Sequence, residues 1–277
     1  MTGNIARLDA VLAAAKAEDR AALIGYLPAG FPDVDTGVRA MTAMLEGGCD
    51  AVEVGLPHSD PVLDGPVIQT ADDIALRGGL RIKDVIRTVA EVQSATDAPV
   101  LCMTYWNPVD RYGPERFAED LAAAGGAGCI LPDLPVEESD PWRQAAGKHG
   151  LATVFVVAPS SREQRLSAIT AAGSGFVYAA SLMGVTGTRE SVGREAQDLV
   201  RRTRATEAVR DGGLSVCVGL GVSTAEQAAE VAAFADGVIV GSAFVKRLLA
   251  AGDDHEAGLA SVRELAGELA AGVRRRA

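Results

Sequence analysis

Short runs of apolar and β-branched residues recur along this chain, and an alanine-rich segment separates each run from the next. In these longer segments the apolar residues repeat with helical spacing, as at Val38, Met41 and Met44. The short runs predict strands and the longer segments predict helices. The predicted strands span Ala22–Leu27, Ala51–Val54, Pro99–Thr104, Gly128–Leu131, Ala152–Val157, Phe176–Ala180, Ser215–Val218 and Gly237–Val240.

Helix boundaries support the same alternation. Ser223-Thr224-Ala225-Glu226 is a capping pattern for a helix start, and Gly47-Gly48 and Gly125-Gly126 predict helix ends. Eight strand and helix units without a linker favour one parallel sheet closed on itself, the α/β fold known as the (β/α)8 or TIM barrel. An open, doubly wound sheet is the alternative. We expect a single domain over residues 1–277, with residues 1–20 forming an N-terminal helix that covers the barrel.

Carboxylates gather at the end of the second predicted strand. Glu53 lies within that apolar strand, and Asp60 and Asp64 follow in a loop that contains three prolines. Burying a carboxylate is costly unless it is paired or needed for chemistry, although an edge glutamate that points at water would also fit. In a barrel, the carboxyl ends of the strands and the loops after them form the site. The sequence therefore places Glu53 and Asp64 at the mouth of the barrel.

Glycine-containing turns follow the last three predicted strands, at residues 184–188, 219–223 and 241–243. Barrels often bind phosphate with the loops after strands seven and eight and with the start of a short helix. No lysine or arginine lies in these turns, so backbone amides, hydroxyls and the helix beginning near Ser242 would hold the anion. Plain turn chemistry is the alternative interpretation.

Composition and charge narrow the class of protein. The net charge is −11 and no long basic stripe exists, which disfavours nucleic-acid binding. The four cysteines lie in or beside apolar runs, which is typical of buried thiols in the cytoplasm. The N-terminus lacks a signal pattern, and no apolar stretch reaches the roughly 20 residues of a membrane span. We therefore expect a cytoplasmic protein.

The sequence lacks the residues that other kinds of catalysis would need. All four lysines lie in predicted helices, so no strand end offers a Schiff-base lysine. Of the three histidines only His58 lies near the predicted mouth, so no metal-ligand set is visible. We find no serine or cysteine nucleophile with a base and no nucleotide-binding fingerprint. The remaining candidates are carboxylates that act as general acid and base. We therefore expect no metal or cofactor, and a substrate that itself accepts the bonding electrons.

Several of these motifs, in order along the chain, resemble the tryptophan synthase alpha chain family. They are residues 53–66, Pro132–Glu138, Gly184–Gly187 and Gly241–Ala243. The resemblance implies retro-aldol cleavage of indole-3-glycerol phosphate to indole and glyceraldehyde 3-phosphate, late in tryptophan biosynthesis, and a beta-chain partner in an α2β2 complex. The chemistry agrees, because protonation of indole C3 gives an indolenine whose iminium accepts the bonding electrons.

The resemblance also implies roles for individual residues. Glu53 would be the acid and base for C3 and the glycerol hydroxyl, and Asp64 would stabilise the indole N–H. Tyr178 would lie beside the glutamate, although a barrel-core aromatic is an equal interpretation. The other implied residues are Gly187, Gly221, Gly241 and Ser242 for the phosphate, Tyr26, Tyr105 and Leu220 for the indole pocket, and Asp60 and Thr186 for loop closure and partner contact.

The sequence departs from the family pattern at two places. His58 stands where an aromatic residue is often found, and the segment Tyr26–Gly30 differs from the threonine-bearing version. These differences concern the pocket lining and partner contacts. Two other functions stay open from the residues, namely another phosphate-binding barrel, such as a sugar-phosphate isomerase or cyclase, and a non-catalytic subunit that activates a partner. We expect the loops at residues 57–66 and 184–193 to close over the substrate.

Overall fold

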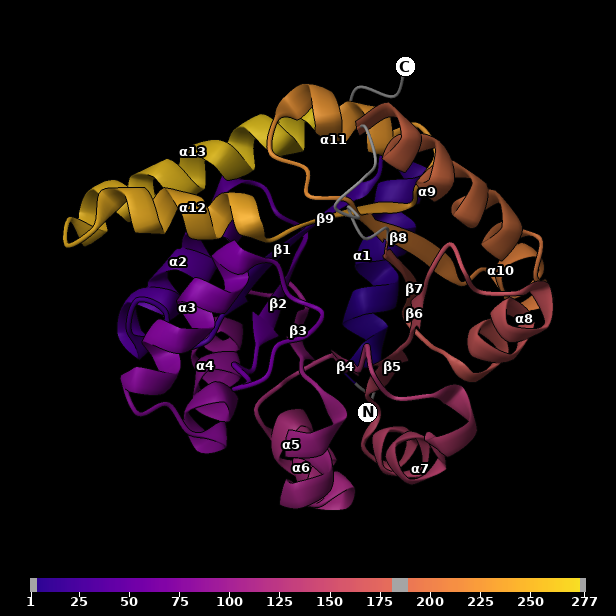
Figure 1. Ribbon diagram of the computed structural model, residues 1–277, viewed down its shortest axis with the longest axis horizontal. Coiled ribbons are helices and arrows are strands. Elements are labelled where there is room, and N and C mark those ends of the chain that lie inside the picture. The colour runs from indigo at the N-terminus through magenta and orange to yellow at the C-terminus, as the bar shows by residue number, and fades with distance from the viewer. Residues whose placement is uncertain (1–3, 181–188, 275–277) are drawn as a thin grey trace.

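One parallel sheet forms the centre of the molecule, in a computed structural model that describes residues 4–180 and 189–274 (Figure 1). All eight predicted strands are present, and no end differs from its prediction by more than one residue. The strands are β1 (Ala22–Pro28), β2 (Ala51–Gly55), β3 (Val100–Met103), β4 (Gly128–Ile130), β5 (Ala152–Val154), β6 (Val156–Val157), β7 (Phe176–Ala180), β8 (Ser215–Gly219) and β9 (Gly237–Val240).

The fifth predicted strand differs from the prediction because it is interrupted at Phe155. The two halves, β5 and β6, lie at opposite ends of the strand order β5-β4-β3-β2-β1-β9-β8-β7-β6. The Phe155 carbonyl accepts a hydrogen bond of 2.9 Å from the amide of Tyr178 on β7. The interruption is thus where the sheet closes on itself, and the closed sheet confirms the predicted barrel.

Helices surround the strands as an outer ring (Figure 1). Helix α1 precedes the first strand, and the other helices follow strands along the chain. They are α1 (Ile5–Ala17), α2 (Val34–Gly47), α3 (Pro66–Arg77), α4 (Ile82–Ser94), α5 (Trp106–Tyr112), α6 (Pro114–Ala123), the 3₁₀ turn η1 (Val136–Glu138), α7 (Asp140–His149), α8 (Glu163–Ala172), α9 (Arg189–Arg204), α10 (Glu207–Arg210), α11 (Ala225–Ala232), α12 (Ser242–Ala251) and α13 (His255–Val273). In the described residues, no helix is apolar over enough length to cross a membrane.

Local sequence sets the helix ends. At the predicted capping pattern the N-cap of α11 is Thr224, whose hydroxyl accepts from the Gln227 amide, while the Ser223 amide donates to the Gln227 side chain. Gly48, at φ +120°, ends α2, because a residue without Cβ adopts this conformation at little cost.

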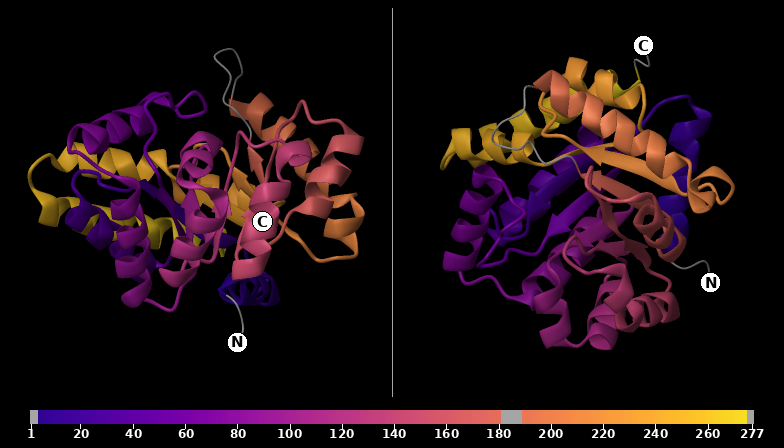
Figure 2. Two further views of the ribbon diagram at one scale, coloured as in Figure 1. Left: turned by 90° about the horizontal axis from the view of Figure 1, so that it is seen from below. Right: turned by 45° about the vertical axis from the view of Figure 1, so that its right-hand side comes forward.

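Alternate side chains of the strands point to two separate cores. Outward side chains pack with the helices, whereas inward ones, such as Ile24, Leu101 and Phe176, fill the barrel interior. Leu8 and Leu12 of α1 belong to this interior core, so α1 covers one end of the barrel. The covered end is the one where the strands begin, and Figure 2 shows α1 below the strands in its left view. The opposite end is free for a site.

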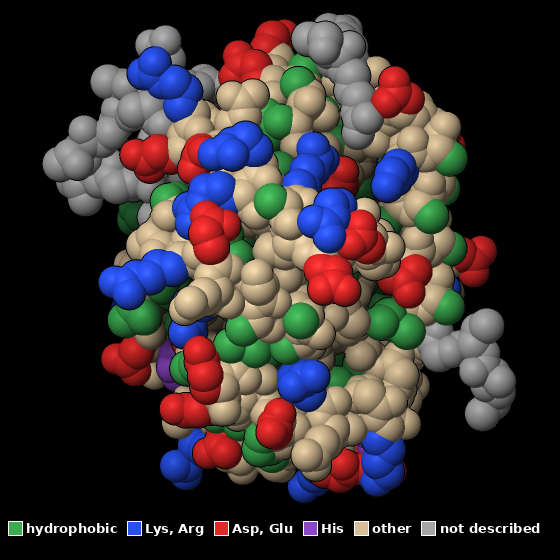
Figure 3. Space-filling view, turned by 90° about the vertical axis from the view of Figure 1, so that its right-hand side faces the viewer, with side chains coloured by type: hydrophobic (Ala, Val, Ile, Leu, Met, Phe, Trp, Pro, Cys, Tyr) green, Lys and Arg blue, Asp and Glu red, His purple; other side chains and the backbone are tan. Residues whose placement is uncertain are grey.

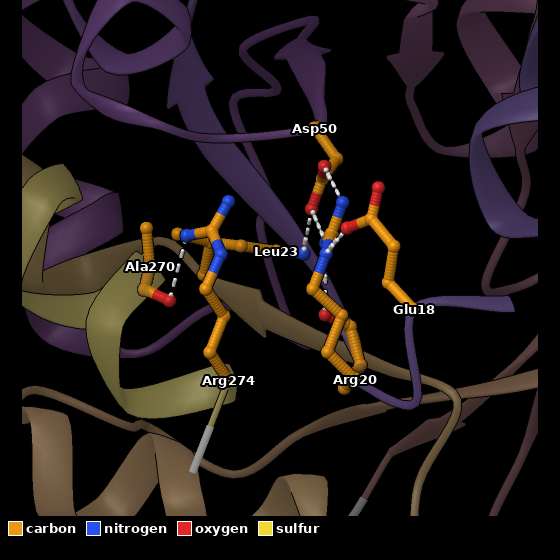
Figure 4. Close-up of polar contacts among 7 residues, drawn as sticks. Glu18, Arg20, Leu23, Asp50, Ala270 and Arg274 are labelled. Carbon is orange, nitrogen blue, oxygen red and sulfur yellow. Dashed lines mark hydrogen bonds and ion pairs between the residues drawn. The ribbon is translucent and has the colours of Figure 1, made fainter. Parts of the chain in front are cut away.

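A buried ion pair fixes the chain beside this closed end. Arg20 lies between α1 and β1 and binds Asp50 with two hydrogen bonds, of 2.7 and 2.9 Å (Figure 4). Asp50 also accepts a hydrogen bond from the Leu23 amide, and Glu18 contacts the Arg20 Nε atom. This network ties the start of β1 to the start of β2, far from the carboxyl ends of the strands.

Acidic and basic side chains are intermixed on the face over α7, α8, α9 and α10 (Figure 3). Two of the ion pairs there are Arg165 with Glu137, at 2.9 Å, and Arg202 with Glu163, at 2.7 Å. No stripe of a single sign runs across this face. Its charges are paired locally, which is the pattern of a solvated surface.

Candidate active site

A cavity of about 740 Å³ opens at the carboxyl ends of the strands. Side chains from β1, β2 and β7 form its floor, and the loops after β2, β8 and β9 form its walls. The residues predicted for the site that line it are Tyr26, Glu53, Asp64, Tyr178, Leu220, Gly221, Gly241 and Ser242. The fold therefore brings together residues as far apart in the sequence as Tyr26 and Ser242.

Glu53 lies on the floor of this cavity and is fully buried, at 0% exposure. Its strand alternates inward and outward side chains, and Glu53 follows the inward Ala51 by two residues. Neither carboxyl oxygen has a hydrogen-bond partner in the described chain. Burial raises the pKa of Glu53 to about 8. The alternative of an edge glutamate in water is wrong, and the side chain is an acid that holds its proton at neutral pH.

Asp64 is held by Tyr105. The Tyr105 hydroxyl donates a hydrogen bond of 2.8 Å to Asp64 Oδ2 and accepts one of 2.9 Å from the Leu63 amide. Burial raises the pKa of Asp64, while the Tyr105 hydrogen bond and the nearby His58 oppose that rise. The ring of His58 lies 5.1 Å from that of Tyr105, centroid to centroid. Asp64 thus differs from Glu53 in its surroundings, since it has a hydrogen-bond partner and Glu53 has none in the described chain.

Two tyrosines, Tyr26 and Tyr178, line the cavity together with Glu53. Tyr26 is the register partner of Glu53 across the β1 and β2 pair, and the Glu53 carboxyl contributes to the raised pKa values of Tyr26 and Tyr178. Each hydroxyl fits against a strand-end glycine. A Cβ atom added to Gly55 would lie 2.3 Å from the Tyr26 hydroxyl, and one added to Gly219 would lie 2.3 Å from the Tyr178 hydroxyl. These glycines leave the space that the tyrosines fill.

The turns after β8 and β9 form the other end of the cavity. Gly221 has a φ of +68°, in the left-handed region that favours glycine. Gly241 is the N-cap of α12, and its carbonyl accepts the first hydrogen bond of that helix from Phe244. The amides of Ser242 and Ala243 precede this donor, so they point out of the start of α12. This arrangement suits an anion bound at the end of the helix.

A second cavity, of about 410 Å³, adjoins the first. The two share part of their wall, and the second extends between the loop after β4 and helix α8. The residues that line both are Leu63, Asp64, Met103, Tyr178 and Gly219. The site is thus an elongated, mostly apolar space with Asp64 in the middle and the anion-binding turns at one end.

Two described residues of the predicted site, Tyr105 and Asp60, do not line the large cavity, and Tyr105 instead contacts Asp64 and Leu63, which do. Asp60 is exposed in the loop after β2, where it accepts a hydrogen bond of 2.7 Å from Ser59. Thr186 and Gly187 lie outside the described residues, as does the first half of the predicted closing loop at residues 184–193, whereas residues 189–193 form the start of α9. Their predicted roles stay predictions.

Two residues near the site were missed by the sequence analysis. Asp72 of α3 is 3% exposed, and its Oδ1 atom has no partner in the described chain. The sequence feature that indicates its burial is the helical spacing of Ile68, Ala71 and Ala75, which places Asp72 beside the buried face of α3. Lys246 of α12 lines the large cavity. The sequence places it in a helix one turn after Ser242 and not in a glycine turn, so its position at the cavity depends on how α12 packs.

The chain is similar in sequence and in fold to proteins of one family. The family model of the tryptophan synthase alpha chain matches residues 12–274. The tryptophan synthase alpha chain of Streptomyces coelicolor is 72% identical over 99% of both chains, and that of Streptomyces avermitilis is 74% identical over 96% of this chain and 94% of that one. A crystal structure of tryptophan synthase from M. tuberculosis, in an aminoacrylate-bound form, superposes with a TM-score of 0.86 at 49% identity and covers 96% of this chain and 99% of that one.

Proposed function

Because the chain belongs to the tryptophan synthase alpha chain family, we propose that its cavity binds indole-3-glycerol phosphate and cleaves it to indole and glyceraldehyde 3-phosphate. The apolar part of the cavity beside Met103 and Tyr178 would take the indole ring. The turns at Gly221 and Gly241 would take the phosphate. The elongated cavity fits a substrate that has an aromatic ring at one end and an anionic group at the other.

In this proposal Glu53 carries the proton transfers. Its protonated carboxyl donates to C3 of the indole ring, which becomes an indolenine with a positive charge on nitrogen. The carboxylate then removes the proton of the glycerol hydroxyl next to the ring. The C–C bond breaks, its electrons return to the ring, and an aldehyde forms. The raised pKa of Glu53 supports this order, because the acid is ready at neutral pH.

Asp64 would stabilise the positive charge that develops on the ring nitrogen. A carboxylate in a partly desolvated site interacts more strongly with such a charge than it would in water. The Tyr105 hydrogen bond supports this role, since it opposes the rise in the pKa of Asp64 and fixes the side chain at the centre of the cavity. Tyr178 would pack beside Glu53 and help to exclude water.

The phosphate would be bound by amides at Gly221, Gly241 and Ser242, together with Gly187 from outside the described residues. We further propose that a tryptophan synthase beta chain covers the mouth of the barrel, in an α2β2 complex. Val62 and Leu63 support a partner there, because both are exposed apolar residues at the rim, at 82% and 42% exposure. We propose a cytoplasmic location, which the four buried free cysteines suit.

The observation that carries the proposal is the buried, unpartnered Glu53 in one cavity with Asp64. The test is a spectroscopic assay of indole release from indole-3-glycerol phosphate by the purified chain, with and without a beta chain. We expect release in both cases and faster release with the beta chain. Absence of release in both cases would contradict the proposal and favour a non-catalytic subunit. Interconversion of a sugar phosphate without indole release would favour an isomerase.

A further inference from the structure

The side chain of Tyr105 contacts both ends of the loop that follows β2. Tyr105 is 8% exposed and lies between β3 and α5, as the N-cap of that helix. Its hydroxyl is hydrogen-bonded to the Leu63 amide at 2.9 Å and to Asp64 Oδ2 at 2.8 Å, late in the loop. Its ring contacts His58, early in the loop. One side chain thus connects the two ends of this loop.

His58 contacts Tyr105 through its aromatic ring. The two ring centroids are 5.1 Å apart, and the ring planes are inclined by 32°. Aromatic rings attract each other at this separation, and such a contact changes an equilibrium by roughly two- to tenfold. His58 is half-buried, so the contact is partly shielded from water.

The hydroxyl of Tyr105 reaches Asp64 only while the ring keeps its orientation. The hydroxyl lies at the far end of the ring, so a rotation about the first side-chain torsion moves it away from the carboxyl. Within the loop, the Val62 amide donates to the Asp60 carbonyl at 2.9 Å, and the Asp64 amide donates to the Pro61 carbonyl at 3.0 Å. These local turns shape the loop, and the contacts with Tyr105 help to place it against the barrel.

His58 also lies close enough to Asp64 to influence its charge. Burial raises the pKa of Asp64, and the Tyr105 hydrogen bond and the nearby His58 oppose that rise. Both of these interactions favour the carboxylate form. The ring contact and the charge of His58 therefore act on the same carboxyl.

We propose that His58 is a positioning residue for Asp64, because its ring holds Tyr105 so that the Tyr105 hydroxyl stays bound to the Asp64 carboxyl. The inference rests on the function proposed above, in which Asp64 stabilises the positive charge on the ring nitrogen. A carboxylate that is displaced from that charge stabilises it less. His58 therefore affects the rate of cleavage and has little effect on substrate binding.

The first test compares turnover of two variants with that of wild type, in the full chain. His58→Leu removes the ring, so kcat for indole release should fall by roughly five- to tenfold, with KM within about threefold of wild type. His58→Phe keeps a ring and should recover most of kcat. His149→Leu is the matched control, because His149 ends α7 just before β5 begins, at the closed end of the barrel. Its kcat should equal that of wild type.

A double mutant shows whether His58 acts through Tyr105. Tyr105→Phe removes the hydroxyl and should lower kcat at least as much as His58→Leu does. Adding His58→Leu to Tyr105→Phe should then cause no further loss. Losses that multiply in the double mutant would contradict the proposal, since His58 would act independently of Tyr105. Equal losses in His58→Phe and His58→Leu would also contradict it, because the ring would not be the active feature.

Hydrogen exchange at the Leu63 amide reports the position of Tyr105 without turnover. This amide donates to the Tyr105 hydroxyl, and Leu63 itself is exposed. Measured by NMR, its exchange should be faster than in wild type by roughly two- to tenfold in His58→Leu and nearly unchanged in His58→Phe. Tyr105→Phe should show the fastest exchange. Equal rates in His58→Leu and wild type would overturn the proposal.

The exchange measurement separates this proposal from the proposed function. If the wild-type chain releases no indole yet His58→Leu speeds exchange at Leu63, the reaction is wrongly assigned and His58 still positions Tyr105. If wild type releases indole and His58→Leu changes neither kcat nor the exchange at Leu63, the reaction stands and the positioning role of His58 is wrong.

Discussion

Glu53 combines full burial with the absence of any partner in the described chain, a state that a carboxyl reaches only at a cost. Desolvation disfavours its charged form and raises its pKa to about 8. Burial also raises the pKa of Asp64, and there the Tyr105 hydrogen bond opposes the rise. The cavity therefore holds two carboxyls in different surroundings, one without a partner in the described chain and one hydrogen-bonded to a tyrosine.

The pH dependence of the reaction follows from the state of Glu53. The proposed reaction begins with the protonated acid, which predominates below its pKa of about 8. We therefore predict that kcat/KM is level between about pH 6 and pH 7.5 and falls by up to about tenfold per unit above pH 8. Indole release across this range measures it. Glu53→Gln is the control and should be about 100-fold or more slower at every pH. A rate that rises through pH 8 would exclude the protonated starting form.

Asp64 makes a different prediction, because its proposed role depends on charge. Asp64→Asn keeps the size of the side chain and a hydrogen bond from Tyr105 but loses the negative charge that stabilises the ring cation. We predict a loss of kcat of about 100-fold or more. The affinity for indole-3-propanol phosphate, a neutral-ring analogue measured by calorimetry, should stay within about threefold of wild type. A collapse of this affinity together with the rate would make Asp64 a binding residue only.

At the scale of the elements, strand ends and helix faces place the groups of the candidate site. β7 and β8 bring Tyr178 against Gly219, and β1 and β2 bring Tyr26 against Gly55. Helix α3 turns Asp72 inward beside Ile68 and Ala71. Small changes in these elements should therefore alter the site even where they leave the catalytic residues in place.

The contact between β8 and Tyr178 can be tested with a single methyl group. Gly219→Ala places a Cβ atom within 2.3 Å of the Tyr178 hydroxyl, so one of the two must move. Because Tyr178 lies beside Glu53, we predict a loss of kcat/KM of about tenfold or more, which corresponds to about 1.4 kcal/mol. Gly147→Ala is the matched control, because nothing lies within 4 Å of its new methyl group. Equal activity in both variants would show that the tyrosine position does not matter.

Asp72 makes stability depend on pH. Its pKa rises from an ordinary 3.8 to about 7, with burial as the main cause and Asp64 as the second. Between these values the folded protein holds a proton that the unfolded chain has lost, so the free energy of unfolding decreases as pH rises. Asp72→Asn removes this dependence.

We predict that the stability of Asp72→Asn relative to wild type increases by roughly 2 kcal/mol from about pH 5 to pH 7 and changes little above that range. Urea unfolding at several pH values measures it. The surface variant Asp73→Asn provides the control, since Asp73 is an exposed neighbour on the same helix. A pH-independent difference would show that Asp72 is solvated or paired in the folded protein.

At the scale of the whole molecule, the two ends of the barrel have separate tasks. α1 and the Arg20 network close the end where the strands begin, and the cavity occupies the end where they finish. A barrel permits this division, because its closed ring of strands supports both ends. Stability and activity should therefore respond to different residues.

Arg20→Met tests this division. It leaves the mostly buried carboxylate of Asp50 without its ion-pair partner, which should reduce the free energy of unfolding by roughly 3 kcal/mol. The values of kcat and KM at a temperature well below unfolding should be unchanged. Arg39→Met breaks an exposed ion pair with Glu256 and should cost less than about 1 kcal/mol. A change in kcat without a change in stability would contradict the separation of the two ends.

The sequence by itself determined the elements and the class of fold. Apolar runs and helical spacing are local properties, so they located eight strands and the start of α12 near Ser242 to within a residue or two. The order of the strands then implied that Glu53 and the glycine turns meet at one end. The family resemblance, which extends over most of the chain, supplied the reaction.

Only the tertiary structure decided the state of each group. Full burial of Glu53, the hydrogen bond between Tyr105 and Asp64, and the inward position of Asp72 depend on residues that are distant in sequence. The break at Phe155 appears only where the ring closes, and Lys246 reaches the cavity only because α12 packs over it. Burial and pairing set the protonation and charge of a site, and both arise when the closed barrel removes side chains from water.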